Sequence, residues 1–213
     1  MQLKIDLHVH SNYSADSLIT PEELIFYAKK RGLDGVAVTD HNRLDGALNI
    51  AKTTDFLILP GMEVTSAKGH VLGLNVQEQI PQGLGVDETV DKIHEAGGTA
   101  IACHPYAFFK MGIGKSVNSK FDAVEVINAS AFPFRHSVKH AEQIAVCLGI
   151  GRVAGSDAHY GPEIGCAYTI VEAEARCDEI CKAIAKGLCQ PFGGGIPLKT
   201  RLKRELAVLR RRF

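Results

Sequence analysis

The sequence predicts an α/β fold in which short strands alternate with helices and close into a barrel of about seven (β/α) units. Two observations lead to this prediction. Seven short apolar runs alternate with helical stretches, which is typical of βα units around a largely parallel sheet. Histidine or acidic residues follow or end nearly every run, and in (β/α) barrels the functional groups converge on the face where the strands end. An open, doubly wound sheet is the competing arrangement.

The expected elements can be placed from their sequence signals. The first helix is the best marked, because Thr20-Pro-Glu-Glu23 has the residues of a capping box with proline at the first helical position, and Gly32 can end the helix. We expect strands at residues 3–7, 35–38, 56–59, 70–74, 100–102, 123–126 and 152–154. We expect helices at residues 24–30, 42–51, 87–96, 135–148, 177–186 and 198–212.

The C-terminal end of the chain differs in charge from the rest. It has seven basic residues against one acid, Glu205, and so carries +6 in a chain whose net charge is zero. The preceding residues carry −6, which suits a site where carboxylates bind cations. Gly193-Gly-Gly195 predicts a flexible joint, so we expect a catalytic barrel over residues 1–195 and a basic helix or tail over residues 196–213. The basic residues are Lys199, Arg201, Lys203, Arg204, Arg210, Arg211 and Arg212.

Length and composition exclude several classes of protein. The 213 residues suit a single domain, and no apolar run approaches the 18 residues that would suggest a membrane span. The N-terminus lacks the basic and apolar regions of a secretory signal, and the six cysteines include no CxxC pair. We therefore expect a cytoplasmic protein with reduced thiols and no membrane association. The sequence leaves the oligomeric state open.

His8 and His10 form an HxH pair directly after the first apolar run. Residues two apart in a strand point to the same face, so the two imidazoles can hold one cation together. Asp157 and His159 form a similar DxH pair after the last expected strand. The remaining candidates also follow or begin apolar runs. They are Asp40, His41, Glu63, His70 and His104.

A single histidine in such a place is usually a partly buried residue whose hydrogen bonds are satisfied. Several histidines and acids buried together at strand ends, however, would each carry the desolvation penalty of a polar group, with no common function to explain it. Bound metal ions would neutralise the acids and use the imidazole nitrogens. The sequence therefore predicts a polynuclear metal site. Ligands limited to imidazole and carboxylate suit Zn, Mn or Fe(II).

An ordered set of motifs resembles the PHP (polymerase and histidinol phosphatase) family over residues 3 to about 175. The resemblance implies a distorted (β/α)7 barrel with two or three divalent metal ions at the C-terminal ends of the strands. It also implies phosphoesterase activity, which most characterised members have. The motifs are HxH at residues 8–10, a Ser-rich loop with Asp16, TDH at 39–41, GxE at 61–63, GHVLGL at 69–74, CHP at 103–105 and GSDAH at 155–159.

Carried over motif by motif, the resemblance implies three metal positions. The first metal would be held by His8, His10, Glu63 and Asp157. Glu63 would bridge to a second metal bound also by His70 and His104. A third metal would be held by His41, His159 and Asp16. Some histidinol-phosphatase-like members have His where this chain has Asp16, a difference that favours the branch acting on nucleotides and short oligonucleotides.

We therefore expect a metal-dependent phosphoesterase that hydrolyses a small phosphomonoester, such as a nucleotide or an oligonucleotide end, through attack by a hydroxide that bridges the metals. Histidinol-phosphate phosphatase is the alternative among enzymes. A non-catalytic, metal-stabilised accessory domain that binds nucleic acid is the alternative from another class, and the complete ligand set favours catalysis. The basic tail could also contact nucleic acid, in which case binding would weaken steeply with salt.

Asp40 and Arg135 are the expected catalytic residues outside the metal ligands. Asp40, beside His41, could orient a ligand or carry a proton, and a helix N-cap is the alternative role. Arg135 follows the strand at 123–126 and could pair bidentately with a substrate phosphate, whereas an ordinary surface arginine is the other interpretation. Lys110 and Lys115, in a glycine-containing loop, are further candidates for phosphate contacts.

Overall fold

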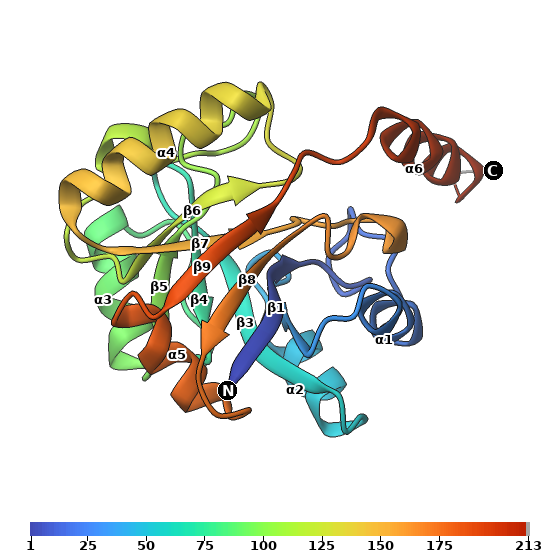
Figure 1. Ribbon diagram of the computed structural model, residues 1–213, viewed down its shortest axis with the longest axis horizontal. Coiled ribbons are helices and arrows are strands. Elements are labelled where there is room, and N and C mark those ends of the chain that lie inside the picture. The colour runs from blue at the N-terminus through green and yellow to red at the C-terminus, as the bar shows by residue number, and fades with distance from the viewer. Residues whose placement is uncertain (212–213) are drawn as a thin grey trace.

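The computed structural model describes residues 1–211 and contains one nine-stranded sheet with helices packed on its outside (Figure 1). The strands are β1 (Gln2–Val9), β2 (Gly35–Val38), β3 (Leu57–Thr65), β4 (His70–Leu74), β5 (Thr99–Ala102), β6 (Ala123–Asn128), β7 (Gly151–Gly155), β8 (Ala167–Glu172) and β9 (Cys189–Gly193). The helices are α1 (Pro21–Lys30), α2 (Asp45–Lys52), α3 (Val86–Glu95), α4 (Phe134–Leu148), α5 (Cys177–Ala185) and α6 (Leu198–Arg211), with short 3-10 turns η1 (Gly114–Ser116) and η2 (Gly161–Glu163).

The predicted α/β barrel is confirmed, and the sheet is larger than expected. Its strand order is β7-β6-β5-β4-β3-β2-β1-β8-β9. Strands β1, β2 and β3 are parallel to one another, as are β5, β6 and β7, while β4 runs antiparallel between the two groups. The carboxyl ends of six strands therefore lie at one end of the molecule.

The sheet nearly closes, because β7 at one end of the strand order lies next to β1 and β8. The amide of Asp157, just beyond β7, donates to the carbonyl of His8 in β1 over 2.7 Å. The Thr169 hydroxyl in β8 accepts from the backbone N–H of Ala154 in β7 and donates to its carbonyl. These bonds bring the first strand and the last parallel strand together.

Both layers of the fold are packed with aliphatic side chains. Strand β2 shows this well, since Ala37 belongs to the core inside the sheet while Val36 and Val38 face the core beneath α1 and α2. A strand buried on both faces has a continuous apolar sequence rather than an alternating one. Within residues 1–211, no helix is long and apolar enough to cross a membrane.

Helix α1 has the capping box that its sequence predicts. The Thr20 hydroxyl accepts from the amide of Glu23, and the Glu23 carboxylate accepts from the amide of Thr20. Proline occupies the start of the helix, where its missing N–H leaves no hydrogen bond unmade. The cap fixes the point at which the chain leaves the Ser-rich loop and turns back along the sheet.

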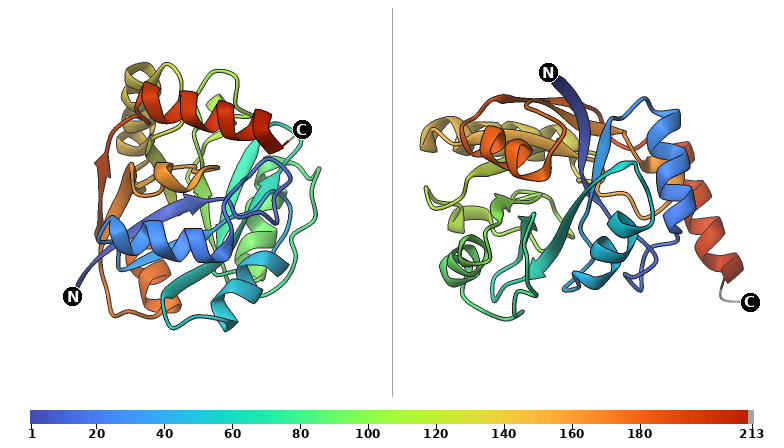
Figure 2. Two further views of the ribbon diagram at one scale, coloured as in Figure 1. Left: turned by 90° about the vertical axis from the view of Figure 1, so that its right-hand side faces the viewer. Right: turned by 90° about the horizontal axis from the view of Figure 1, so that it is seen from below.

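Two strands and one joint differ from the expectation. Strands β8 and β9 lay outside the seven predicted ones; β8 pairs antiparallel with β1, and β9 is mostly exposed and contains Pro191. Gly193 is the last residue of β9 rather than part of a free joint. Helix α6 follows and lies beyond the sheet (Figure 1), and the left view of Figure 2 shows it on the other side of the molecule's face from α1. Arg212 lies outside the described residues, and the domain boundary at residue 195 stays a prediction.

Replacing Gly155 with alanine is expected to open the contact between β7 and β1. A Cβ atom at this position would lie 2.4 Å from the Cβ of His8 and 2.9 Å from its backbone nitrogen. Overpacking of this kind lowers the free energy of unfolding by about 1–3 kcal/mol. Urea denaturation measures the change. Gly194→Ala, where a Cβ meets nothing within 4 Å, is the matched control, and equal stability of the two variants would contradict this account of closure.

Candidate metal centre

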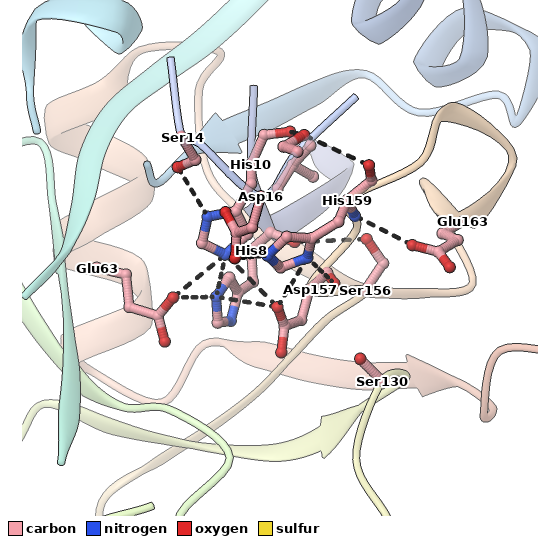
Figure 3. A network of polar contacts seen from close by, with 12 residues as sticks. His8, His10, Ser14, Asp16, Glu63, Ser130, Ser156, Asp157, His159 and Glu163 are labelled. Carbon is pink, nitrogen blue, oxygen red and sulfur yellow. Dashed lines mark hydrogen bonds and ion pairs between the residues drawn. The ribbon is translucent and has the colours of Figure 1, made fainter. Parts of the chain in front are cut away.

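The nine side chains predicted as metal ligands converge at the end of the barrel where the parallel strands finish. Figure 3 shows six of them: His8, His10, Asp16, Glu63, Asp157 and His159. They come from seven separate places in the chain. His8 and His10 come from the end of β1, Asp16 from the following loop, His41 from the turn after β2, Glu63 from β3, His70 from the start of β4, His104 from the turn after β5, and Asp157 and His159 from the turn after β7.

The Glu63 carboxylate lies at the middle of the cluster and is fully buried. Its Oε1 atom is 2.7 Å from Nδ1 of His70 and 2.8 Å from Nε2 of His104. Its Oε2 atom lies between three further imidazole nitrogens, at 3.1–3.4 Å. These belong to His41, His10 and His8. Five histidines, two from the end of β1 and three from other elements, therefore surround one carboxylate.

Asp157 forms a second acidic point on the opposite side of the HxH pair. Its Oδ1 atom lies 3.5 Å from Nε2 of His10 and 3.6 Å from Nδ1 of His159. Its Oδ2 atom accepts hydrogen bonds from the Lys110 ammonium and the Asn128 amide. Oδ2 is thus held by hydrogen bonds, while Oδ1 is directed toward the imidazoles.

The donor atoms of the cluster fit bound cations. Oε2 of Glu63 and Oδ1 of Asp157 are buried and have no hydrogen-bond partner within the described residues, although several imidazole nitrogens lie near them. Nε2 of His8 and Nε2 of His10 are only 3.2 Å apart. Nitrogens and oxygens that converge on shared points, without bonding to one another in good geometry, are arranged as ligands of metal ions are.

The buried carboxylates of the cluster also require positive charge nearby. Burial alone would lower the pKa of His8, but the charges of Asp157, Glu125 and Glu63 raise that pKa well above its ordinary value. Burial alone would raise the pKa of Glu63, yet the histidines around it, His8 foremost, hold that pKa well below its ordinary value. Buried carboxylates need compensating charge. Either protons on the imidazoles or metal ions can supply it.

Asp16 reaches the cluster from its solvent side. The side chain is 55% exposed, and its Oδ2 atom lies 3.2 Å from Nε2 of His159 and 3.4 Å from Nε2 of His41. Hydrogen bonds and charge from the same two histidines outweigh partial burial and lower the pKa of Asp16. Asp16 therefore closes the outer edge of the cluster, where the resemblance places a third metal.

The structure groups the candidate ligands in overlapping sets. In each set, the donor atoms lie within 4.8 Å of one another. The sets are His10 with His41 and His159; His8 with His10 and Glu63; His8 with His104 and Asp157; His41 with Glu63 and His70; and Glu63 with Cys103 and His104. Because His8, His10 and Glu63 recur in several sets, the division of ligands among three metals stays a prediction.

Two of the candidate ligands have a strained backbone. His104 has φ 32° and Asp157 has φ 54°, a region that side-chain-bearing residues rarely adopt. Such conformations cost about 1–3 kcal/mol and persist only where the surroundings fix them. Here the amide of His104 donates to Glu125, and the amide of Asp157 donates to the His8 carbonyl. The strain turns both side chains into the cluster.

Glu125 is a site residue that the sequence interpretation missed. It lies in β6, is buried, and its Oε1 atom is 3.0 Å from Nδ1 of His8. Its Oε2 atom accepts from the amide of His104 and from the side chain of Asn128. A carboxylate behind a ligating histidine fixes the orientation of the imidazole ring. The available signal was a charged residue inside an apolar strand.

Asp40 lies behind the ligands rather than among them. It is fully buried, and its carboxylate accepts from the amide and hydroxyl of Ser11 and from the hydroxyl of Ser14. The Ser14 hydroxyl lies 3.4 Å from Nδ1 of His10 and accepts from the amide of His41. Helix α2 begins later, with Leu44 as its N-cap, so the capping alternative is wrong. The orienting role of Asp40 stays a prediction.

The basic candidates divide between the site and the surface. Lys110 lines the cavity over the metal cluster and contacts Asp157. Arg135 is an exposed residue in the first turn of α4 and lines neither that cavity nor the larger one beside it. Lys115 lines a separate cavity beside α3. The structure therefore places Lys110, and not Arg135, beside the candidate ligands, and a phosphate contact by either residue stays a prediction.

A model of the PHP domain family matches residues 6–206. The chain belongs to the PHP domain family. The match extends into α6, so the family's sequence pattern includes most of the basic C-terminal helix as well as the barrel.

Several relatives share recognisable sequence with this PHP chain. An uncharacterized protein of Methanocaldococcus jannaschii is 37% identical over 141 residues, which is 60% of this chain and 82% of the relative. A protein of Caldicellulosiruptor saccharolyticus named a probable phosphatase is 26% identical and covers 86% of this chain and 87% of the relative. A 5'-3' exoribonuclease of Haemophilus influenzae is 33% identical over 89 residues, 38% of this chain and 32% of the enzyme.

Solved structures share the fold at low sequence identity. PsfC from Pseudomonas syringae superposes with a TM-score of 0.73 at 17% identity, covering 97% of both chains. A two-domain protein containing a predicted PHP-like metal-dependent phosphoesterase, from Bacteroides vulgatus, gives 0.72 at 19% identity over 91% of this chain, which spans only 65% of that protein. A lesion-specific endonuclease from Pyrococcus furiosus gives 0.63 at 20% identity, with 90% and 58% covered.

Glu125→Gln is expected to weaken metal binding by about 10–100-fold, because the amide cannot hold the His8 imidazole with a negative charge. Titration with Zn²⁺ or Mn²⁺ in isothermal calorimetry measures the affinity, and circular dichroism checks that the variant is folded. The control is Glu95→Gln, which removes an exposed carboxylate paired with Lys92 on α3. Wild-type affinity in the folded Glu125 variant would show that His8 needs no such support.

Proposed function

We propose that this protein is a metal-dependent phosphoesterase that hydrolyses a small phosphomonoester, with nucleotides or oligonucleotide ends as the substrate class. The observation that carries the proposal is the set of imidazoles and carboxylates gathered at the end of the barrel, in which buried Oε2 of Glu63 and Oδ1 of Asp157 have no hydrogen-bond partner within the described residues. The PHP membership supports the same chemistry. Asp16, in place of the histidine of some histidinol-phosphatase-like members, supports the nucleotide branch over that alternative.

Divalent ions bound by these ligands would neutralise phosphoryl oxygens and lower the pKa of a bound water. The protein's own contribution is positioning. Glu125 and the Ser14 hydroxyl, the latter held by Asp40, fix the rings of His8 and His10. The Lys110 ammonium lies in the cavity wall, where it can donate hydrogen bonds to a phosphoryl oxygen. Because these dipoles and charges are already in position, they need not reorient as charge develops during phosphoryl transfer.

A nuclease that engages longer nucleic acid is the second candidate. The names of the Haemophilus exoribonuclease and the Pyrococcus endonuclease support it, and so does the basic outer surface of α6, where Lys199, Lys203 and Arg210 are exposed. A purely structural accessory domain is less well supported, because the full ligand set is present and assembled. A cytoplasmic location stays a prediction.

Glu63→Gln is expected to lower kcat/KM by at least about 100-fold with every substrate, because the central carboxylate lies against five candidate ligand histidines and would itself hold two of the metals. The assay is phosphate release from nucleotides, nucleoside bisphosphates, sugar phosphates and histidinol phosphate, run with Mn²⁺ and with Zn²⁺. Glu88→Gln, an exposed carboxylate on α3, is the control. Undiminished hydrolysis by the Glu63 variant, with less than one equivalent of metal in the wild type, would refute the proposal.

Replacing Lys199, Lys203 and Arg210 together with glutamine is expected to weaken single-stranded oligonucleotide binding. If all three contact phosphates, the slope of log affinity against log salt falls by about 2, at roughly 0.7 per contact. Fluorescence anisotropy across a salt series measures both quantities. Lys92, Lys120 and Lys182 form a matched triple control elsewhere on the surface. If the slope is unchanged in the α6 variant, a nuclease that binds nucleic acid through this surface is excluded.

A further inference from the structure

The loop between β5 and β6 forms one wall of the candidate metal centre. Phe109, Lys110 and Met111 line the cavity of about 180 Å³ over the predicted ligands. The carbonyl of Met111 accepts from the amide of His70 over 2.7 Å, and the carbonyl of Lys110 accepts from the amide of Gly112. This segment therefore lies against the ligands, although the sequence predicts none of its residues as a ligand.

The tip of this loop has a strained backbone. Phe109 has φ 61°, in the left-handed region that bulky residues rarely adopt. Its side chain is 93% exposed and stacks on the exposed ring of Phe132, with centroids 6.3 Å apart, so burial does little to hold this conformation. The next side chain, Lys110, turns inward and contacts Asp157. A strained backbone persists only where its surroundings fix it, and the contact between Lys110 and Asp157 is one of the bonds that fix the tip.

Lys110 supplies positive charge to the carboxylate of Asp157. Its ammonium donates to Oδ2, and its side chain is 23% exposed. Burial alone would raise the pKa of Asp157, but the charge of Lys110, ahead of that of His8, holds that pKa well below its ordinary value. Oδ1 of Asp157 has no hydrogen-bond partner within the described residues. A metal ion held by Oδ1 would bring further positive charge near the ammonium, and like charges repel more strongly in a buried site than in bulk water.

We propose that Lys110 is an internal cation that competes with a metal ion for Asp157, and that metal binding displaces the ammonium and opens the loop tip. This regulation rests on the proposed function, because it assumes that the cluster holds the catalytic metals. A lysine suits such an exchange, since its ammonium is a compact charge on a flexible stem. Asp157 keeps a donor after the exchange, because the Asn128 amide also donates to Oδ2, over 3.1 Å. The exchange removes one of the bonds that hold Phe109 in its strained conformation.

Isothermal calorimetry of the metal-free protein with Mn²⁺ tests the competition. Mn²⁺ is the probe because thiolates, which favour zinc, would otherwise bind metal outside the cluster. Lys110→Met is expected to bind Mn²⁺ at least about tenfold more tightly than wild type, since one nearby charge changes the affinity of a buried carboxylate for a proton by that much or more. Lys115→Met removes an exposed lysine of the same loop that lines a separate cavity, and is expected to keep wild-type affinity. If Lys110 only holds Asp157 in position, Lys110→Met binds Mn²⁺ more weakly, and weaker or unchanged binding would overturn the proposal.

Lysine acetylation mapped by mass spectrometry tests the displacement in the wild-type protein. An ammonium that is bonded to a carboxylate and shielded from solvent reacts slowly with N-hydroxysuccinimidyl acetate. Mn²⁺ is therefore expected to increase the labelling rate of Lys110 several-fold. Exposed Lys115 is the internal control, and its rate is expected to stay constant. Equal labelling of Lys110 with and without bound Mn²⁺ would show that the ammonium stays on Asp157, against the proposal.

The proposal for Lys110 and the proposed function fail in different ways. If the wild type binds Mn²⁺ and hydrolyses phosphate esters, but Lys110→Met binds no more tightly, Lys110 is not a competing cation and the phosphoesterase function stands. If Lys110→Met binds Mn²⁺ more tightly but no phosphate ester is hydrolysed, the proposed function alone is refuted. If the wild type binds neither Mn²⁺ nor Zn²⁺, both proposals fail.

Discussion

The whole arrangement depends on one buried carboxylate. Glu63 lies where five imidazoles from different strands and turns meet, and removing such a charge from water is unfavourable unless positive charge or hydrogen bonds compensate. The histidines can compensate it as protonated side chains, or metal ions can do so in their place. Because these histidines come from four different parts of the chain, the compensation is available only when the barrel has folded.

The barrel brings these groups together through close contacts between backbones. Gly155 in β7 has no side chain, and its Cα therefore approaches His8 in β1 more closely than any Cβ would permit. This contact lets the turn after β7 carry Asp157 and His159 to the HxH pair, although about 150 positions separate them in the sequence. Strained φ angles at His104 and Asp157 complete the geometry. The candidate ligands therefore come together only when the sheet packs in this way.

The sequence predicted seven strands and the candidate ligands, but it missed Glu125 and strand β9. Apolar runs ending in His, Asp or Glu revealed the seven strands and all nine residues that converge, because parallel strands deliver their ends to one face. Glu125 was missed since one acid inside an apolar strand has no motif around it. Strand β9, which contains Pro191 and is mostly exposed, lacks the alternation that marks a strand. Arg135 was favoured over Lys110 because position after a strand does not show which way a loop folds back.

The structure shows what part of the positive charge near the C-terminus contacts. As a sequence feature, the charge of +6 leaves three partners open: nucleic acid, an acidic partner or the rest of the protein itself. In the structure, Arg204 faces the buried acid Glu163, and Glu163 in turn holds the backbone of His159. Part of the basic charge of α6 therefore balances one acid of the barrel, Glu163, which in turn contacts the candidate ligand His159. A change on α6 that weakens the Arg204 contact would be transmitted to the metal centre, so the helix and the barrel should be treated as parts of one site.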